Sequence, residues 1–447
     1  MTAEIHRAGD LPRRPRIFYG WWIVIAAGAA SLFNSVSTFA GFGAFFLPIQ
    51  REFHTDRASL SAAVSLARLE GSLLGPLEGW LVDRYGPRIL MRIGMIIMGL
   101  GFILVSMTQN ITMFYLAFVL GIALGASLGA GTPGSVAVAN WFVKKRSTAF
   151  GLVNAGFAIG TILVPAVGWL VESLGWRQAA LILGIIIWVT GIPLSFIMRH
   201  KPEQYGYLPD GVEPAPVPTA AAPGEGVGAS PAARQEAATP IPVEEVNFTT
   251  KQALVTRAFW MLGLSFAFRT LATGAVNVHQ IPFMLDQGYS LTEATLSVSA
   301  VGVGSFIGRV VLGWMGDRTD KRYALAASLA AMAVGMFIFA TSTTMSQVLV
   351  FAAIYGLGFG GTAPLMSALR GEYFGRQHFG AIGGFQSLLV LIGTAGGPTF
   401  AGIAYDRTGD YRWAFTVISL VAFIGVGLTL AATPPKEVRA LAEKRTV

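Results

Sequence analysis

The chain of 447 residues contains no cysteine. Without cysteine a small fold held by disulfide bonds cannot form, and neither thiol catalysis nor a cysteine-ligated metal site is available. The sequence also has no phosphate-binding glycine loop, no cluster of metal-ligand residues and no nucleophile–base pair at a recognisable spacing. We therefore expect neither an enzyme nor a cofactor, and any work that the protein performs must draw on a gradient and not on ATP.

Charge is scarce as well: Asp, Glu, Lys and Arg make up 13% of the residues, against about 25% in an average soluble protein. Hydrophobic residues make up 53%, and the mean hydropathy is +0.58. A water-soluble surface cannot be built from so few charges, whereas 54 glycines and 30 phenylalanines suit closely packed membrane helices. The basic residues behind the net charge of +8 lie between apolar runs, so they indicate membrane orientation and no binding to nucleic acid.

Crossing a bilayer as an α-helix takes about 20 mostly apolar residues. Twelve runs meet this requirement, at 17–47, 59–82, 89–107, 112–139, 148–171, 178–198, 258–285, 291–315, 323–341, 346–369, 379–404 and 412–431. The first run is longer than the apolar core of a signal peptide, and it predicts a tilted or bent helix. The expected fold class is all-α integral membrane, with twelve transmembrane helices.

Lysine and arginine are distributed unevenly over the connections between these runs. If the N-terminus is inside, most of them fall in cytoplasmic segments such as 84–92 and 144–146. The opposite side holds only Arg51, Arg57, Arg177, Arg407 and Arg412. Because positive residues gather on the cytoplasmic side, we expect a multi-pass protein of the cell membrane with both termini in the cytoplasm.

Hydropathy collapses between residues 202 and 250, where Pro, Ala, Gly and Glu are frequent and no helical period is present. This composition predicts a flexible tether between two six-helix bundles. The expected boundaries are an N-terminal cytoplasmic tail 1–16, a first bundle 17–199, a cytoplasmic linker 200–256, a second bundle 257–432 and a C-terminal tail 433–447.

The two halves repeat short motifs at a nearly constant distance. Gly79–Arg84 (GWLVDR) ends the second run and Gly313–Arg318 (GWMGDR) ends the eighth, while Pro165 and Pro398 lie in the fifth and the eleventh. Such a repeat indicates a six-helix unit duplicated in parallel. In folds of this kind the substrate site lies where the halves meet, near the middle of the membrane.

Residues Gly79–Arg88 (GWLVDRYGPR) resemble the loop signature G-x-x-x-D-R-x-G-x-R of the major facilitator superfamily of membrane transporters. In this signature one glycine permits close helix approach and the other a tight turn. The resemblance implies the major facilitator fold of two parallel-repeat bundles. It also implies a gating role for the matching residues of both copies, which are Gly79, Asp83, Arg84, Gly86, Arg88, Gly313, Asp317 and Arg318.

A narrower resemblance connects the chain to the bacterial oxalate–formate antiporter and monocarboxylate transporter branch. It rests on Phe18–Trp22 (FYGWW), on Phe45–Pro48 (FFLP) and on the segment Arg199–Gly211 after the sixth run. That branch carries small organic anions and holds the substrate carboxylate with an arginine of its eighth helix, a position that Arg309 takes here. It further implies a bacterial inner membrane as the location.

The chain departs from this branch in three places. The first run lacks the lysine that the animal monocarboxylate carriers have there. Ser305 stands one turn before Arg309, where the animal carriers have an aspartate. The eleventh run offers Gln386 and Thr394 and has no lysine like the one that the oxalate carrier uses for a second carboxylate.

Charged side chains within the apolar runs are functional candidates, because each costs about 2.5–3.5 kcal/mol to place at mid-membrane. Arg309 can hold a carboxylate with both arms of its guanidinium, and Arg269 and Arg68 are candidates to assist it. Further candidates for substrate binding are the polar residues Asn34, Asn277 and Gln386.

Other groups in the runs are candidates for coupling and gating. Glu70 is the first candidate to carry a proton, since carboxyl groups inside membranes serve in proton relays, and His279 is the second. Arg370 and Glu372, at the end of the tenth run, are expected to form contacts of the cytoplasmic gate. For Glu78 we expect a structural pair with an arginine near the cytoplasmic side.

These features predict a secondary active transporter that moves a small organic anion, a monocarboxylate, by alternating access, with protons or in exchange for a counter-anion. Its expected partners are the lipid bilayer, the substrate and the coupling ion, and a monomer should be functional. One alternative is a proton-driven efflux carrier for amphipathic organic compounds, which the many aromatic residues would suit. From another class, the alternative is a non-transporting membrane sensor or a membrane enzyme.

Overall fold

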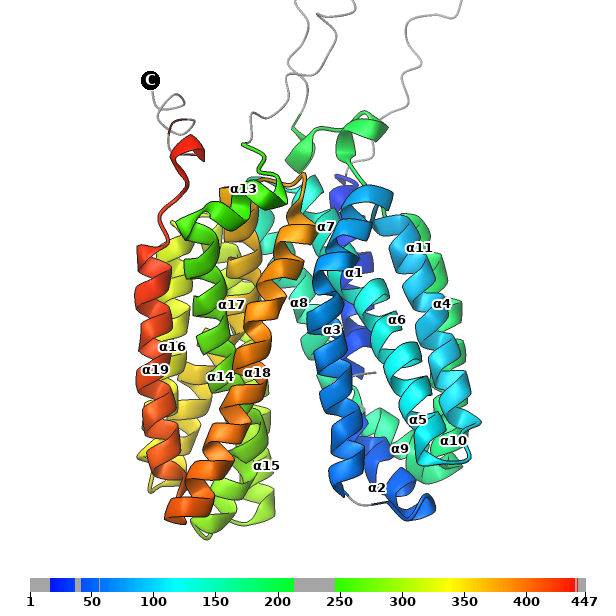
Figure 1. Ribbon diagram of the computed structural model, residues 1–447, viewed down its shortest axis with the longest axis vertical. Helices are drawn as coiled ribbons and strands as arrows, with labels where there is room; N and C mark the ends of the chain where they lie inside the picture. The colour runs from blue at the N-terminus through cyan, green and yellow to red at the C-terminus, as the bar shows by residue number, and fades with distance from the viewer. Residues whose placement is uncertain (1–16, 37–41, 56, 213–245, 439, 441–447) are drawn as a thin grey trace, which may run out of the picture.

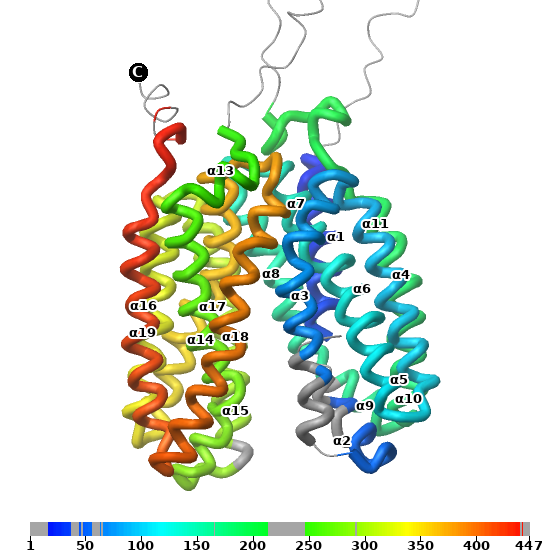
Figure 2. Tube along the Cα trace, in the orientation of Figure 1, coloured from blue at the N-terminus to red at the C-terminus, as the bar shows by residue number. Residues whose placement is uncertain are grey.

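The computed structural model describes residues 17–36, 42–55, 57–212, 246–438 and 440. Within these ranges the regular elements are helices, and they form two bundles that stand side by side (Figures 1 and 2). This is the all-α, two-bundle architecture that the sequence predicts. Each bundle has its own hydrophobic core, and the second bundle has a further cluster around Phe259 and Phe374.

The first bundle supplies six transmembrane helices, several of them made of consecutive segments. The first is α1 (Gly20–Asn34) followed by α2 (Phe42–Glu52), the second is α3 (Arg57–Tyr85) and the third is α4 (Pro87–Ser106). The fourth joins α5 (Ile111–Leu116), η2 (Ala117–Ala123), α6 (Leu124–Ala126), η3 (Ser127–Gly131) and α7 (Thr132–Trp141). The fifth joins α8 (Arg146–Ile162) and α9 (Val164–Leu174), and the sixth joins α10 (Trp176–Ile186), η4 (Ile187–Gly191) and α11 (Ile192–Ile197).

The second bundle consists of six long helices. They are α14 (Arg257–Asp286), α15 (Leu291–Gly316), α16 (Lys321–Ala340), α17 (Met345–Phe374), α18 (Phe379–Thr408) and α19 (Tyr411–Ala431). Three short elements flank the segment that connects the bundles: η5 (Pro202–Tyr205), η6 (Pro209–Gly211) and α13 (Thr250–Val255). Part of the predicted linker, residues 213–245, lies outside the described residues.

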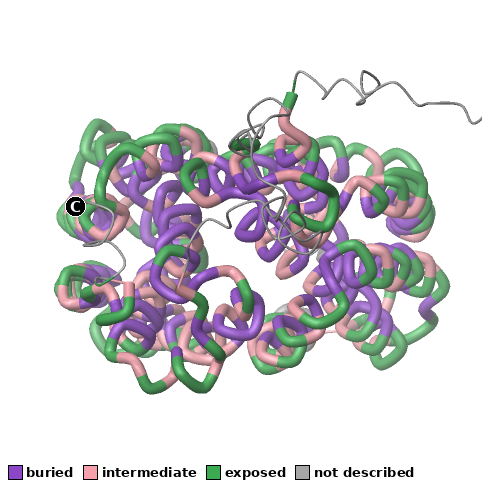
Figure 3. Tube along the Cα trace, turned by 90° about the horizontal axis from the view of Figure 1, so that it is seen from above, coloured by how far each residue is buried: buried purple, intermediate pink, exposed green. Residues whose placement is uncertain are grey.

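The described residues contain 10 helices that are long and apolar enough to cross a membrane. α3 has sufficient length, 29 residues, but carries several charges, and α1 is a shorter apolar helix that precedes undescribed residues. Large apolar side chains on the outside of the bundles, such as Ile162, Trp169 and Ile392, are 66–68% exposed. Exposed positions ring both bundles in Figure 3. An exterior of this kind suits lipid and not water.

Helix ends follow from local capping. Ser290 and Thr344 each form a capping box, with Glu293 and Gln347, at the start of α15 and α17. Gly175 ends α9 with φ of 83°, a backbone conformation that other residues rarely adopt. The fifth transmembrane helix is interrupted at Leu163, two residues before Pro165, whereas α18 continues through Pro398.

The two bundles touch mainly along two helix pairs, α3 with α18 and α8 with α15. Glycines permit this approach: a Cβ at Gly79 would overlap the backbone of Gly380, and one at Gly313 would come within 3.0 Å of Gly151. These positions lie toward the end of the bundles that also carries residues 17 and 438, which we call the termini face (Figure 1). The opposite end is called the far face.

Candidate functional site

Arg309 lies on α15 at the contact between the two bundles and is 8% exposed. Its Nη1 donates a hydrogen bond of 3.1 Å to the backbone oxygen of Asn154 on α8. Its Cζ is 5.4 Å from the centroid of the Phe157 ring. Among the described residues no Asp or Glu forms an ion pair with Arg309. A carbonyl dipole and aromatic faces therefore surround a buried cation, which leaves it able to bind an anion.

A second arginine faces the same group of aromatic rings. The Cζ of Arg269, on α14, lies 4.9 Å from the centroid of Phe359, and that of Arg309 lies 5.8 Å from it. Arg269 Nε also donates a 2.8 Å hydrogen bond to Thr362 Oγ1. Phe359 thus contacts two cations, and it stacks on Tyr355 with 6.2 Å between the ring centroids. Sequence analysis missed Phe359, because spacing along one helix carries no information about a ring on another.

The other predicted substrate residues lie in different surroundings. Asn34 is half-buried and lines a cavity between the bundles. Gln386 is 2% exposed and faces Arg370 on α17. Arg68 on α3 and Asn277 on α14 have exposed side chains. The structure thus brings Arg309 and Arg269 together, while the substrate roles of the other four residues stay predictions.

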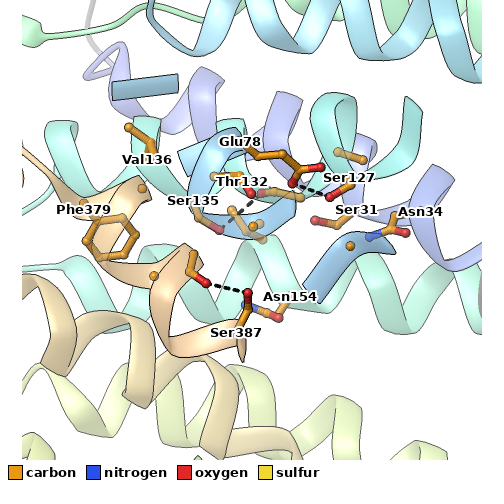
Figure 4. A pocket seen from close by; sticks show the side chains of 18 of the residues that line it. Ser31, Asn34, Glu78, Ser127, Thr132, Ser135, Val136, Asn154, Phe379 and Ser387 are labelled. Carbon is orange, nitrogen blue, oxygen red and sulfur yellow. Dashed lines mark hydrogen bonds between the residues drawn. The ribbon is translucent and has the colours of Figure 1, made fainter. Parts of the chain in front are cut away.

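A cavity of about 310 Å³ lies between the bundles. Its walls come from α1, α3, η3, α7 and α8 of the first bundle and from α17 and α18 of the second. Polar side chains line the cavity together with glycines and apolar residues, and Figure 4 labels Ser31, Asn34, Glu78, Ser127, Thr132, Ser135, Asn154 and Ser387 among the polar ones. Asn154 and Phe157, which contact Arg309, belong to the same wall. The cavity therefore adjoins the arginine site.

Two glutamates of α3 have carboxylate oxygens that are buried and unsatisfied. Neither oxygen of Glu70 has a hydrogen-bond partner among the described residues. Glu78 is 2% exposed, and its Oε2 accepts a 2.5 Å hydrogen bond from Ser127 Oγ on η3, while its Oε1 lacks a described partner. The expected arginine pair of Glu78 does not occur among the described residues. The partner of Glu78 is instead Ser127 of the fourth transmembrane helix.

The two residues expected at the gate serve different contacts. Arg370 donates from Nε to Gln386 Oε1 at 2.7 Å, and its Cζ lies 5.3 Å from the ring centroid of Phe379. Glu372 forms an ion pair of 2.8 Å with Lys321, which joins α17 to α16 inside one bundle. Arg370 lines the cavity between the bundles and Glu372 does not. Their gating role stays a prediction.

His279 occupies a fixed position near the far face. Its Nδ1 lies 3.2 Å from the hydroxyl of Tyr411, and its Nε2 lies 3.0 Å from the backbone oxygen of Pro398. Since a carbonyl oxygen only accepts, Nε2 carries the hydrogen, and in a neutral ring Nδ1 accepts from Tyr411. To take up a proton at Nδ1, this ring would have to give up the hydrogen bond that it accepts from Tyr411. The role of His279 in carrying a proton stays a prediction.

The repeated aspartates hold the bundles together at the termini face. Asp83 at the end of α3 accepts hydrogen bonds from the backbone N–H groups of Gly380 (3.0 Å) and Ala381 (2.8 Å) at the start of α18. Asp317 after α15 accepts in the same way from Ser147 (2.7 Å) and Thr148 (2.8 Å) at the start of α8. Each bundle thus caps a helix of the other, where a negative charge is favoured.

The basic residues of the same motif lie against aromatic rings, and none of them forms an ion pair with an acid in the part of the chain that the structure describes. Arg84 lies 5.2 Å from the ring centroid of Trp80, and Arg318 lies 3.9 Å from that of Trp314. Arg88 lies 5.4 Å from Phe196. Gly86 turns the chain between α3 and α4 with φ of 86°, as expected for the second glycine of the motif.

Both described ends of the linker lie on the termini face and contact loops, which sequence analysis did not foresee. Asp210 accepts from the backbone N–H groups of Val143 (3.0 Å), Lys144 (2.8 Å) and Lys145 (3.0 Å). Asn247 accepts in the same way from Arg376 and Gln377, both at 3.1 Å. The two linker ends therefore hold corresponding loops of the two bundles.

A contact between the bundles adds to this arrangement. Arg376 donates to the backbone oxygen of Asn140 at 3.0 Å and pairs with Glu203, which follows the first bundle. Asn140 in turn donates to the backbone oxygen of His200 at 3.1 Å. Burial and the nearby charge of Lys201 lower the pKa of His200, so its ring stays neutral near pH 7.

The chain is similar in sequence to one protein family and to individual members of it. The family model described as Major Facilitator Superfamily matches residues 23–290 and 262–446. Monocarboxylate transporter 12-B of Danio rerio is 27% identical over 446 residues, which cover 96% of this chain and 90% of that protein. Monocarboxylate transporter 13 of Rattus norvegicus is 23% identical over 420 residues, covering 92% and 88%.

Among solved structures, the proton:xylose symporter XylE covers 95% of this chain and 99% of its own, with a TM-score of 0.70 and 14% identity. At this identity the likeness concerns the fold, and it confirms the predicted two-bundle architecture. Both relatives named above come from vertebrates. They give no support to the bacterial inner membrane that the sequence led us to expect. They do support the prediction of a multi-pass membrane protein.

Proposed function

We propose a function on the premise that this chain belongs to the major facilitator superfamily, whose family model matches most of its length. It is a multi-pass membrane transporter and not an enzyme. We infer that it moves a small monocarboxylate by alternating access between its two bundles. The observation that carries this inference is Arg309, a cation 8% exposed at the bundle contact, without an acidic partner among the described residues.

Arg309 meets the physical requirements of a carboxylate site. A buried charge is costly unless another charge or dipole compensates it, and the described surroundings supply one carbonyl oxygen and aromatic rings. A carboxylate could accept two parallel hydrogen bonds from the remaining N–H groups of the guanidinium. Such charge-assisted hydrogen bonds are stronger in a water-poor site than hydrogen bonds between neutral groups. The substrate would thus complete the site. The relatives' names, monocarboxylate transporters 12-B and 13, agree with this substrate class.

Arg269 contributes the second positive charge of this site. Its guanidinium lies near the same Phe359 ring as Arg309 and adds to a positive potential that attracts an anion. The ring of Phe359 would contact the apolar part of a small acid. In this proposal Asn34, Asn277, Gln386 and Arg68 are polar residues along the substrate's path.

The way in which the bundles touch supports the proposal of alternating access. The described contacts between bundles run from the level of Ser72 and Ser387 to the termini face. With the termini in the cytoplasm, as the distribution of Lys and Arg predicts, this is an outward-facing arrangement. Opening requires the caps made by Asp83 and Asp317 to break. Because one chain contains both bundles and both arginines, we propose that a monomer is functional.

Coupling to an ion gradient completes the proposal. The sequence has no nucleotide-binding loop, so accumulation of an anion requires a proton carried with it or a counter-anion carried against it. Glu70 is our first candidate for the proton, because both of its carboxylate oxygens are buried without a described partner. A carboxyl group in this state can gain and lose a proton without breaking hydrogen bonds.

The test is uptake into proteoliposomes that contain the purified protein. Radiolabelled acetate, L-lactate and pyruvate serve as probes, with oxalate and an amphipathic cationic dye as comparisons, with and without an inward proton gradient. We expect uptake of at least one monocarboxylate, competition among the monocarboxylates and no transport of the dye. Dye transport without monocarboxylate transport would replace this proposal by the efflux alternative.

A further inference from the structure

The cavity between the bundles contains one acid and one base that do not pair. Glu78 reaches it from α3 of the first bundle, and Arg370 reaches it from α17 of the second. At about 310 Å³ it has the volume of a small ligand site, since such sites begin near about 300 Å³. Figure 4 shows Glu78 beside Ser127, and Asn154 and Ser387 farther along the same space.

Glu78 is held in place by one hydrogen bond and keeps one oxygen open. Ser127 Oγ donates to its Oε2 at 2.5 Å, and Oε1 has no partner among the described residues. The charged groups that surround it on neighbouring elements are few. On α3 they are Arg68, Glu70, Asp83 and Arg84, and from α17 comes Arg370, while Glu372 of α17 pairs with Lys321. α4 and α8 carry Arg88, Arg92 and Arg146 at their termini-face ends, and the cavity-lining parts of α1, η3, α7 and α18 carry none.

Arg370 is positioned by neutral groups. Gln386 Oε1 accepts from its Nε at 2.7 Å, and the ring of Phe379 lies under its guanidinium at 5.3 Å. No described acid forms an ion pair with it. Gln386 is 2% exposed, and its Oε1 is oriented by the hydrogen bond from Arg370. Its Nε2 has no partner among the described residues, so this N–H group can donate a hydrogen bond to a ligand. Arg370, held in this position, can therefore bind an anion.

The cavity lies next to the Arg309 site, and its Arg370 lies closer to the termini face than Arg309 does. Asn154 and Phe157 belong to both, since they contact Arg309 and line the cavity. Arg370 lies about one turn before the end of α17, whereas Arg309 lies about two turns before the end of α15. An anion that leaves Arg309 toward the termini face would therefore meet Arg370 next.

We propose that this cavity is a second binding station for the transported monocarboxylate, in which Arg370 binds the carboxylate and Glu78 takes up the accompanying proton at Oε1. This inference rests on the proposed function and adds to it the site where anion and proton meet. It differs from the coupling role of Glu70, which lies two turns nearer the far face on the same helix and would deliver the proton.

Electrostatics makes the two binding events depend on each other. In the empty cavity the charges of Glu78 and Arg370 sum to zero. An anion on Arg370 leaves a net negative charge in the cavity, and a proton on Glu78 removes it. A proton without the anion leaves Arg370 uncompensated. Anion and proton therefore bind together, which is the requirement for symport.

The test uses whichever of acetate, L-lactate and pyruvate the wild-type protein accumulates in proteoliposomes. Glu78→Gln should lose accumulation driven by a proton gradient while it retains exchange of preloaded substrate. Arg370→Gln should raise KM about tenfold or more, the effect of losing about 1.4 kcal/mol of binding. Arg370→Lys, which keeps the charge but loses the planar fork, should lie between Arg370→Gln and wild type.

Matched controls remove the same charges outside the cavity. Glu172→Gln on α9 and Arg407→Gln on α18 change exposed residues and should behave as wild type. Full gradient-driven accumulation by Glu78→Gln, or an unchanged KM in Arg370→Gln, would overturn the second station. Absence of transport for all three acids in the wild-type protein would instead contradict the proposed function itself.

A further variant covers the case in which Glu78→Gln fails to fold. Ser127→Ala removes the donor to Oε2 and keeps both charges, so it should shift the pH at which accumulation is half-maximal. Thermal unfolding and size-exclusion chromatography report whether each variant is folded. An unshifted pH midpoint in a folded Ser127→Ala protein would overturn the role of Glu78.

Discussion

The two halves of this transporter agree at the termini face and differ in the middle of the membrane. Asp83 and Asp317 make the same pair of backbone hydrogen bonds in opposite directions, each to a helix of the other bundle. Four residues before the repeated glycines Gly79 and Gly313, however, the first half has Gly75 and the second has Arg309.

This difference separates packing from chemistry. A Cβ at Gly75 would come within 3.2 Å of the backbone oxygen of Gly384 and would overlap Ser387, so α3 and α18 pack backbone to backbone. At the corresponding place α15 presents a guanidinium to α8. Features that both halves retain are those that hold the bundles together, and features that only one half has are those that can recognise a substrate. Each of the following predictions tests that division.

The largest effect should come from the unrepeated arginine. Arg309→Gln removes the charge that would hold the carboxylate and should nearly eliminate monocarboxylate uptake, whereas Arg309→Lys should weaken it because the bidentate fork is lost. Initial uptake rates in proteoliposomes measure both. Insertion should be normal, because a mid-membrane charge is removed.

Arg407→Gln, an exposed arginine at the far end of α18, is the control for loss of a positive charge. Wild-type uptake by a correctly inserted Arg309→Gln protein would contradict the carboxylate site. The substrate class would then pass to the efflux alternative.

A second unrepeated charge should affect coupling and leave the movement of substrate intact. Glu70 has no acidic counterpart in the second half, where Gly304 stands. Glu70→Gln should abolish accumulation against a gradient but preserve counterflow of preloaded substrate. Substrate-driven alkalinisation of the outer medium, followed with a pH dye, should disappear as well. Unchanged uphill transport would remove Glu70 from the mechanism.

The repeated aspartates should act on conformation and do so equally. Asp83→Asn and Asp317→Asn each replace an acceptor of two N–H groups by an amide with one oxygen, so one bond is lost. A cap is worth about 1 kcal/mol, so each variant should shift the population toward the termini-open state about fivefold, and the two together more. Because the chain has no cysteine, Ser135→Cys in the cavity wall can report this shift through labelling by an impermeant maleimide.

Asp406→Asn, an exposed residue of α18, is the matched control and should leave labelling unchanged. If only one of the two variants increased labelling, the repeated caps would not be equivalent. The two aspartates would then make the same hydrogen bonds without contributing equally to the stability of the closed termini face.

Sequence reasoning reached the features that depend on one segment at a time. Apolar runs gave the helices, the repeated GWLVDR and GWMGDR motifs gave the two-bundle organisation, and a charge in a run gave Arg309. It failed where the partner lies on another helix. Ser127 is hydrogen-bonded to Glu78, Gln386 is hydrogen-bonded to Arg370, and Phe359 contacts two arginines of different helices. Spacing along a helix reports neighbours three or four residues away and is silent about these contacts.

The smallest effect should come from cutting the linker. Asp210 and Asn247 fasten its two ends to corresponding loops, and the bundles hold one another through α3 with α18 and α8 with α15. A protease site introduced within 213–245 should therefore be cleaved without separating the halves. They should elute together in size-exclusion chromatography and retain most of the uptake rate. Asp210→Ala serves as the sensitised background, because it frees one end from residues 143–145, and cleavage should then lower the rate further. Separation of the halves after cleavage in the otherwise unchanged chain would mean that the linker, and not the repeated contacts, keeps the bundles together.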